Sequence, residues 1–111
     1  MELSTCSKCC LVAVGLLVSS FVYHAAVPAA DGSAVFKNNC VMCHGADGKG
    51  LPALKTPDFT DPKWQASTKD KEIREVIKNG KKGTMMVGFA DKLKDQEVSA
   101  VIAYIRSLKK K

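Results

Sequence analysis

The sequence predicts an all-α domain that is small and rich in loops. Three segments place apolar residues at helical spacing, and no segment alternates apolar and polar residues as a strand does. Prolines and glycines interrupt residues 45–63, which are therefore expected to form a loop. With 111 residues, the chain is long enough for one domain.

The three helices are expected within residues 31–39, 67–80 and 95–108. Polar residues at the start of the first segment offer helix caps. Ser67 and Asp70 resemble a capping box at the start of the second helix. The last helix carries the clearest apolar stripe, formed by Val98, Val101, Ile102, Ile105 and Leu108.

Residues 1–30 have the pattern of a secretory signal peptide. A weakly basic start precedes an uncharged apolar run at residues 11–22, and small residues follow it. Cleavage is expected after Ala29 or Ala30. The alternative is an uncleaved N-terminal anchor, which needs about 20 apolar residues in a row. Either outcome exports the domain that is expected at residues 31–111.

The segment CVMCH joins Cys40 and Cys43 to His44 and could hold zinc, cycle a disulfide or attach a haem. A structural zinc site needs four ligands, and the exported segment offers only these three. A thiol-disulfide site normally sits in a strand–helix–strand unit, which the sequence does not predict, so it is retained as the lesser alternative. Covalent haem attachment uses both thiols, and His44 can bind the iron.

A second axial ligand to the iron is then expected from a methionine. Met42 lies inside the attachment turn and cannot reach the opposite face of the haem. Met85 and Met86 follow in a loop with a glycine on each side. A methionine pair is ordinarily core filler, but a thioether is also a haem ligand. The residues alone leave the choice between these two methionines open.

Residues 31–109 resemble the small class I cytochromes c of bacteria. The resemblance is carried by the CVMCHG motif, Phe36, the segment PDFTDPKW at residues 57–64, the segment MVGFADKL at residues 86–93, and the tripeptide AYI at residues 103–105. It implies a cytochrome c fold, with three main helices and long loops around one covalently attached haem c. Val87 stands where the family prefers proline, and Lys94 where a capping serine is common.

The resemblance also assigns roles to single residues. Cys40 and Cys43 would form the thioethers, and His44 and Met86 would be the axial ligands, with Met86 preferred over Met85. Phe36 and Tyr104 would pack where the first and last helices cross. A carbonyl near Pro52 or Pro57 would accept a hydrogen bond from Nδ1 of His44. Trp64 would either reach a haem propionate or be a core aromatic.

An iron with both axial positions filled has no place for a small substrate, so the expected function is that of an electron carrier and not of an enzyme. One electron would pass by outer-sphere transfer through the exposed haem edge. The pocket is expected to be lined by Leu51, Leu54, Phe59, Ile73, Ile77, Val87, Phe89, Leu93, Val98 and Ile102. A membrane-tethered haem subunit of a respiratory or dehydrogenase complex is the alternative.

The net charge of +6 bears on the partners. Lysines flank both loops, namely Lys49, Lys55, Lys81, Lys82, Lys92 and Lys94. They predict redox donors and acceptors with acidic docking faces, unless they are only a solvated surface. Nucleic acid is excluded as a partner because no aromatic residues are interleaved with the basic ones. The protein is expected to be a monomer, either periplasmic or anchored by its leader to the outer face of the inner membrane.

Overall fold

The computed structural model describes residues 28–111 and shows helices and loops without a strand in that range. The expected signal peptide or anchor, apart from its last three residues, lies outside the described residues. The helices are α1 (Gly32–Asn39), α2 (Val41–His44), the short 3-10 helix η1 (Pro52–Leu54), α3 (Pro62–Ser67), α4 (Asp70–Asn79) and α5 (Asp95–Ser107). The all-α prediction is confirmed. None of the helices between residues 28 and 111 has the length and apolar character needed to cross a membrane.

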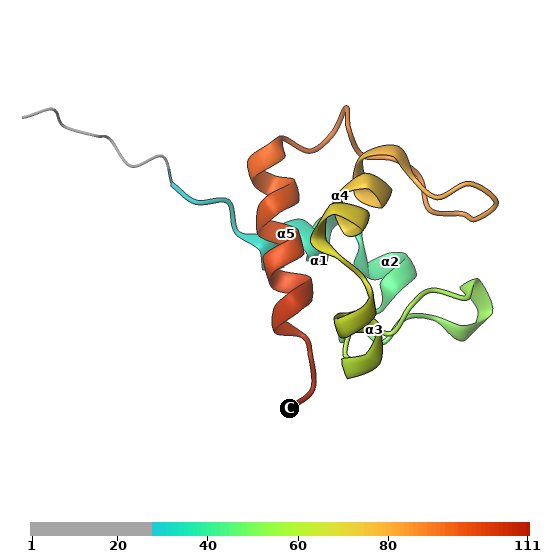
Figure 1. Ribbon diagram of the computed structural model, residues 1–111. Coiled ribbons are helices and arrows are strands. Elements are labelled where there is room, and N and C mark those ends of the chain that lie inside the picture. Colours follow the sequence, from blue (N-terminus) through green and yellow to red (C-terminus); the bar gives the residue numbers. More distant parts are fainter. Residues whose placement is uncertain (1–27) are drawn as a thin grey trace, which may run out of the picture.

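The crossing of α1 and α5 organises the fold (Figure 1). The Asp31 carboxylate accepts the N–H of Ser33 at 2.9 Å and so caps α1. The two helices approach closely at Gly32, where a Cβ atom would collide with the backbone carbonyl of Ala100. The rings of Phe36 and Tyr104 lie 5.3 Å apart between their centroids, which confirms the contact expected at this crossing.

The longest helix in the described part of the chain, α5, supplies four of the ten apolar residues buried in the core. Its apolar stripe is buried, as the spacing predicts, through Val98, Val101, Ile102 and Ile105. Its start lacks the usual capping serine, but the Glu97 carboxylate accepts the N–H of Lys94 at 2.8 Å. That bond satisfies one of the free N–H donors at the helix start. The helix therefore begins directly after Lys94, although Lys94 replaces the serine that is common in the family.

The start of the second predicted helix was wrong. Residues 62–67 form a separate helix, α3, because Asp61 accepts the N–H of Lys63 at 2.9 Å and Pro62 suits a first helical position. Ser67 ends that helix, so it cannot pair with Asp70 in a capping box. The second helix, α4, begins only at Asp70. Part of residues 45–63 is also helical, since η1 and the first turn of α3 lie there.

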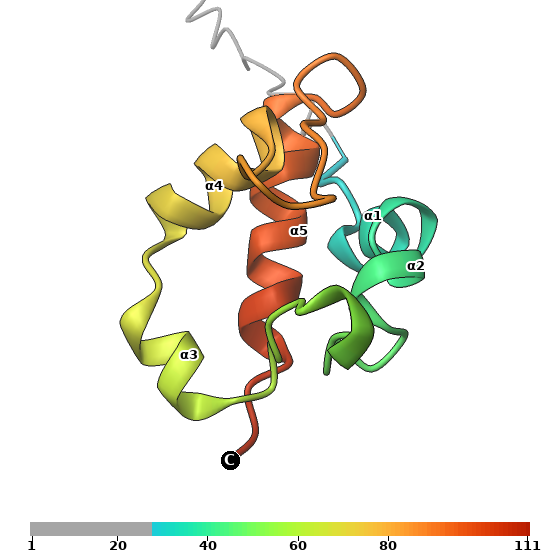
Figure 2. The same ribbon diagram turned by 90° about the vertical axis from the view of Figure 1, so that its right-hand side faces the viewer.

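Two long loops project from the same side of the group of helices. The loops that follow α2 and α4 both extend away from α5 (Figure 1). Viewed from the side of these loops, α5 lies behind, with α3 and α4 on one side and α1 and α2 on the other (Figure 2). The CVMCH motif, the methionine pair and the aromatic residues lie on three different segments of the chain. All three segments therefore face the same region of the molecule.

Candidate cofactor pocket

A cavity of about 670 Å³ lies in that region. Its volume falls within the range of about 300–1,000 Å³ that small-molecule and cofactor sites occupy. Six of the ten residues predicted to line it do so, namely Leu54, Phe59, Ile73, Ile77, Val87 and Phe89. The other four were wrong: Leu51 is exposed, and Leu93, Val98 and Ile102 are buried in the helical core behind the cavity.

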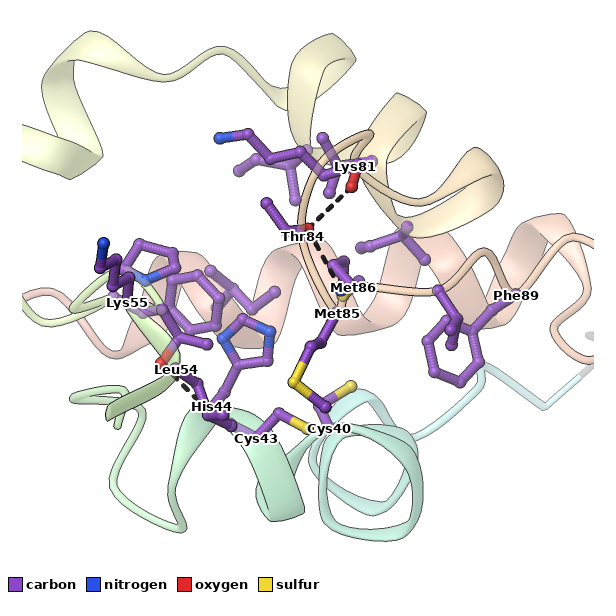
Figure 3. A pocket seen from close by; sticks show the side chains of 18 of the residues that line it. Cys40, Cys43, His44, Leu54, Lys55, Lys81, Thr84, Met85, Met86 and Phe89 are labelled. Atoms are coloured by element: carbon purple, nitrogen blue, oxygen red, sulfur yellow. Dashed lines mark hydrogen bonds between the residues drawn. The ribbon is translucent and has the colours of Figure 1, made fainter. Parts of the chain in front are cut away.

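The CVMCH motif forms one wall of this cavity. Cys40 ends α1, while Cys43 and His44 lie in α2, whose single turn is closed by the N–H of His44 donating to the Cys40 carbonyl at 2.9 Å. Both cysteines are half-buried, carry free thiols and line the cavity together with His44. One short turn thus presents two thiols and one imidazole to a largely apolar space (Figure 3).

The His44 ring is held against an aromatic neighbour. It stacks on Phe59 with 4.7 Å between the ring centroids and 19° between the planes. Burial lowers the pKa of His44, which favours the neutral imidazole that binds metals. Its Nδ1 atom is buried without a hydrogen-bond partner in the described residues, so the bond that it was expected to donate to a carbonyl near Pro52 or Pro57 is not present.

The thiol of Cys40 is poorly suited to disulfide exchange. Burial, and secondarily the neighbouring Cys43, raises the pKa of Cys40 to about 11. A thiol with such a pKa is rarely a thiolate near neutral pH, and the thiolate is the nucleophile in exchange. Within residues 28–111, no three His, Cys, Asp or Glu side chains come together as a site for a metal ion. Neither the disulfide nor the zinc interpretation gains support.

The loop after α4 forms another wall. Thr84, Met85 and Met86 all line the cavity, and Figure 3 shows this loop on the side away from Leu54 and Lys55. The exposed fraction of Met85 is 76%, whereas Met86 is half-buried. The structure therefore brings the methionine pair to the same cavity as the CVMCH turn.

Trp64 lies on the wall formed by α3. It lines the cavity and packs against Phe59, with 4.8 Å between the ring centroids. It therefore packs against the edge of the core, and a contact with a propionate stays a prediction.

One residue that contributes to the site was missed by sequence reasoning. The hydroxyl of Thr56 accepts the N–H of Leu51 at 2.6 Å and donates to the Cys43 carbonyl at 3.1 Å. It ties the loop after α2 to the CVMCH turn and also lines the cavity. A single threonine in a loop rich in glycine and proline gives no local signal of this role.

Comparison with known proteins agrees with the geometry. The family model for cytochrome c matches residues 29–109. The FixP subunit of a cbb3-type cytochrome c oxidase from Bradyrhizobium sp. (strain ORS 278) is 35% identical over 80 residues, which cover 72% of this chain and 27% of that protein. The dihydro-heme d1 dehydrogenase of Pseudomonas aeruginosa is 33% identical over 96 residues, covering 85% of this chain and 18% of that protein. The chain thus spans about a quarter or less of the length of these two curated relatives.

Solved structures also match, one of them over nearly its whole length. The KustC0563 c-type cytochrome is 37% identical, with a TM-score of 0.67, and the match covers 72% of this chain and 99% of that one. Cytochrome cL from the marine methylotroph Methylophaga aminisulfidivorans is 26% identical, with a TM-score of 0.59, over 70% of this chain and 51% of that one.

The residues of the cavity fit the cofactor of these relatives. Two thiols on one turn suit covalent attachment, and an apolar space of this volume suits a porphyrin. The imidazole of His44 lines the same cavity, and burial favours its neutral form, which can bind iron. The chain belongs to the cytochrome c family, and its residues 29–109 form the electron-transfer domain of that family, which carries covalently bound haem c.

Proposed function

We propose that the protein is a one-electron carrier whose redox centre is held by four side chains. Cys40 and Cys43 would form the two thioethers, and His44 and Met86 would be the ligands of the iron. The observation that carries this proposal is that one cavity is lined by both thiols, by a neutral imidazole and by the methionine loop.

Each of these residues has a definite chemical role. Cys40 and Cys43 would each supply a thiol whose S–H can add to a vinyl group of the cofactor, an addition that needs no oxidant and has no leaving group. His44 donates a nitrogen lone pair, and the soft sulfur of Met86 favours the ferrous state. The apolar lining excludes water and disfavours the additional charge of the ferric state. When bound, haem c supplies an iron that gains or loses one electron without a change of ligands.

Burial favours Met86 over Met85 as the ligand. Met86 is half-buried at the cavity, whereas three quarters of Met85 is in contact with solvent. A ligand sulfur must be shielded from water to keep a stable bond, so the more buried thioether suits the role. The resemblance to the family selects the same residue.

A haem stain of the denatured protein, with the absorption spectrum of its reduced form, tests the proposal. The protein should be expressed in a host that attaches haem c. Colour that persists through denaturation is expected, together with no titratable thiol from Cys40 and Cys43. The Cys40→Ala/Cys43→Ala variant is the control and should lose the stain. A colourless wild-type protein with two reactive thiols would favour a thiol-disulfide protein instead.

The absence of enzymatic activity is also part of the proposal. With His44 and Met86 both bound to the iron, no position would remain for a small ligand. The reduced native protein is therefore expected not to bind carbon monoxide at neutral pH. Binding at neutral pH would point to a sensor or a peroxidase, in which one ligand leaves the iron.

We further propose that the redox partners carry acidic faces. Six exposed lysines lie in or beside the two loops that border the cavity, and Lys55 and Lys81 line it directly. Electrostatic steering by such groups raises the association rate and weakens with salt. Lys81→Glu/Lys82→Glu should reduce the rate of electron transfer to an acidic partner protein, while Lys109→Glu/Lys110→Glu at the C-terminus should reduce it much less. If both pairs of substitutions slowed electron transfer equally, the lysines beside the cavity would act only as part of the general surface charge.

A tethered haem subunit is the second candidate. The relative from Bradyrhizobium is a subunit of an oxidase, and this chain corresponds to about a quarter of it. Both candidates place the domain outside the cytoplasm, in the periplasm or on the outer face of the inner membrane. Sequencing the amino terminus of the purified protein and locating it in cell fractions separates them. A start near residue 30 in the soluble fraction supports the mobile, monomeric carrier, and an intact leader in the membrane fraction supports the subunit.

A further inference from the structure

The methionine loop is closed by a tight turn. The N–H of Thr84 donates to the Lys81 carbonyl at 3.2 Å, which defines a β-turn over residues 81–84. Gly83, the third residue of the turn, has a φ of 75°. A positive φ at this position is typical of a type II turn, and glycine adopts it without strain. The turn therefore fixes the entry to Met85 and Met86.

The exit of the loop is fixed as well. The N–H of Phe89 donates to the Ile77 carbonyl at 2.8 Å, and the N–H of Ala90 donates to the Lys78 carbonyl at 3.1 Å. Both carbonyls belong to the last turn of α4, where they would otherwise lack a partner. The conformational freedom of the loop is thus confined to the few residues around the methionine pair.

The hydroxyl of Thr84 connects the turn to Met86. It donates to the Lys81 carbonyl at 2.8 Å and accepts the N–H of Met86 at 3.2 Å (Figure 3). The N–H of Lys81 donates in turn to the Met86 carbonyl at 3.0 Å. Both backbone polar groups of Met86 are therefore held by the turn, one of them through a side chain.

Met85 has no such support. Neither its N–H nor its carbonyl takes part in a hydrogen bond within residues 28–111, and its side chain is 76% exposed. Yet Met85 lines the same cavity and lies one residue from Met86. A modest rearrangement of the loop would exchange one thioether for the other. Val87 follows the pair, so the chain lacks a proline ring that would restrict the backbone at this point.

We propose that Thr84 is a positioning residue that selects Met86 over Met85 as the sulfur donor to the iron. The inference rests on the proposed function, because it presumes a methionine ligand. The hydroxyl holds the backbone of Met86 in the orientation that places its side chain at the cavity. Without that hydroxyl, Met85 and Met86 should compete for the iron with more similar affinities.

The test counts methionine ligands in the haem-loaded ferric protein. Methionine labelled with ¹³C at its methyl group gives one strongly shifted NMR signal for each iron-bound thioether. Thr84→Val keeps the shape of the side chain but removes the hydroxyl. We expect it to raise the ratio of Met85-bound to Met86-bound protein by about 5-fold, the effect of one hydrogen bond of ordinary strength. Thr84→Ser retains the hydroxyl and should restore the wild-type ratio.

Three further variants make the result decisive. Thr84→Val/Met85→Leu should lose the second signal, which assigns it to Met85. Ser107→Ala removes an exposed hydroxyl that donates to the Tyr104 carbonyl at 2.6 Å in the last turn of α5, and should leave the ratio unchanged. Thr84→Ala repeats the measurement if Thr84→Val is not recovered with haem. A ratio that stays at the wild-type value in the valine or alanine variant overturns the selection by Thr84.

Failure of the ligand assignment gives a different pattern. If Met85→Leu abolishes the wild-type signal and Met86→Leu preserves it, the proposed ligand is wrong whatever the Thr84 variants do. If Met86→Leu abolishes the signal but removal of the Thr84 hydroxyl changes nothing, the ligand is right and the positioning role is wrong.

Discussion

Phe59 stacks on His44 and at the same time closes an aromatic cluster beneath the cavity. Its ring centroid lies 4.7 Å from that of His44, 4.8 Å from that of Trp64 and 6.2 Å from that of Phe36. The ring is 5% exposed. One side chain therefore links the imidazole to α3 and to the crossing of α1 and α5.

Replacing Phe59 should destabilise the folded protein. Phe59→Leu removes the stacked ring and leaves a void, which costs on the order of 1–2 kcal/mol of unfolding free energy. Phe89→Leu is the matched control, because Phe89 is only half-buried and lies outside the cluster. Denaturant unfolding of both haem-loaded variants measures the difference. A larger loss for Phe89→Leu would show that the cluster is not the more important contact.

Arg106 should be more important for stability than its ion pair suggests. Its guanidinium donates to the Gln65 carbonyl and to the Gln65 side-chain oxygen at 2.9 Å each, and to the Thr68 carbonyl at 2.6 Å. Arg106→Ala leaves these acceptors unpaired at the junction of α3 and α4, and we expect a loss of about 2–3 kcal/mol in unfolding free energy.

The ion pair itself should contribute less. Arg106 also contacts Asp70 at 2.7 Å, but the Asp70 side chain is 66% exposed, and surface pairs are worth about 0–1 kcal/mol. Asp70→Asn removes the charge while leaving the other hydrogen bonds of Arg106 intact. Thermal and denaturant unfolding of the two variants should therefore differ clearly. Similar losses would mean that the ion pair, and not the backbone contacts, stabilises this junction.

The helices with long apolar stripes could be predicted from the sequence because burial follows their spacing directly. The short helix α3 could not, because Pro62 was read as a helix breaker although it suits the first position after Asp61. The contact of Arg106 with Gln65 also lay beyond sequence reasoning. The two residues are 41 positions apart, and no local pattern connects them.

The candidate site was predictable where its residues are close in sequence. Cys40, Cys43 and His44 share one turn, so their spacing alone brings them to one surface. The methionine pair is different, because two adjacent identical residues carry no pattern that selects one of them. Their difference arises from the three-dimensional shape of the loop, namely the hydrogen bonds of Thr84 within it and the unequal exposure of Met85 and Met86.

The turn before α3 should make the stability of the folded protein depend on pH in the acid range. The Asp58 carboxylate accepts the hydroxyl of Thr60 at 2.7 Å and its N–H at 2.8 Å, and these two bonds lower the pKa of Asp58 below its usual 3.8. The folded state thus has the lower pKa. The stabilising contribution of Asp58 is complete above pH 3.8 and is lost as the pH falls through the folded-state value.

Asp58→Asn measures that contribution. The variant should be less stable than the wild type at neutral pH, and the gap should narrow below about pH 4 as the wild-type carboxylate is protonated. Urea midpoints at several pH values test this. A gap that stays constant down to about pH 2 would show that the charge of Asp58 has no part in holding the turn.

Met86→Ala should weaken the sulfur-to-iron absorption band of the ferric protein, because Met85, the other thioether at the cavity, is mostly exposed and lacks the hydrogen bonds that hold Met86. Loss of the soft ligand should also lower the reduction potential by on the order of 0.1 V or more. Met85→Ala is the matched control in the same loop and should change both quantities little, because its side chain is mostly in solvent. Absorption spectra and redox titration of the two variants measure the effects. The opposite result, with the band lost in Met85→Ala and kept in Met86→Ala, would assign the iron to Met85 and show that exposure in the absence of the cofactor does not report the ligand.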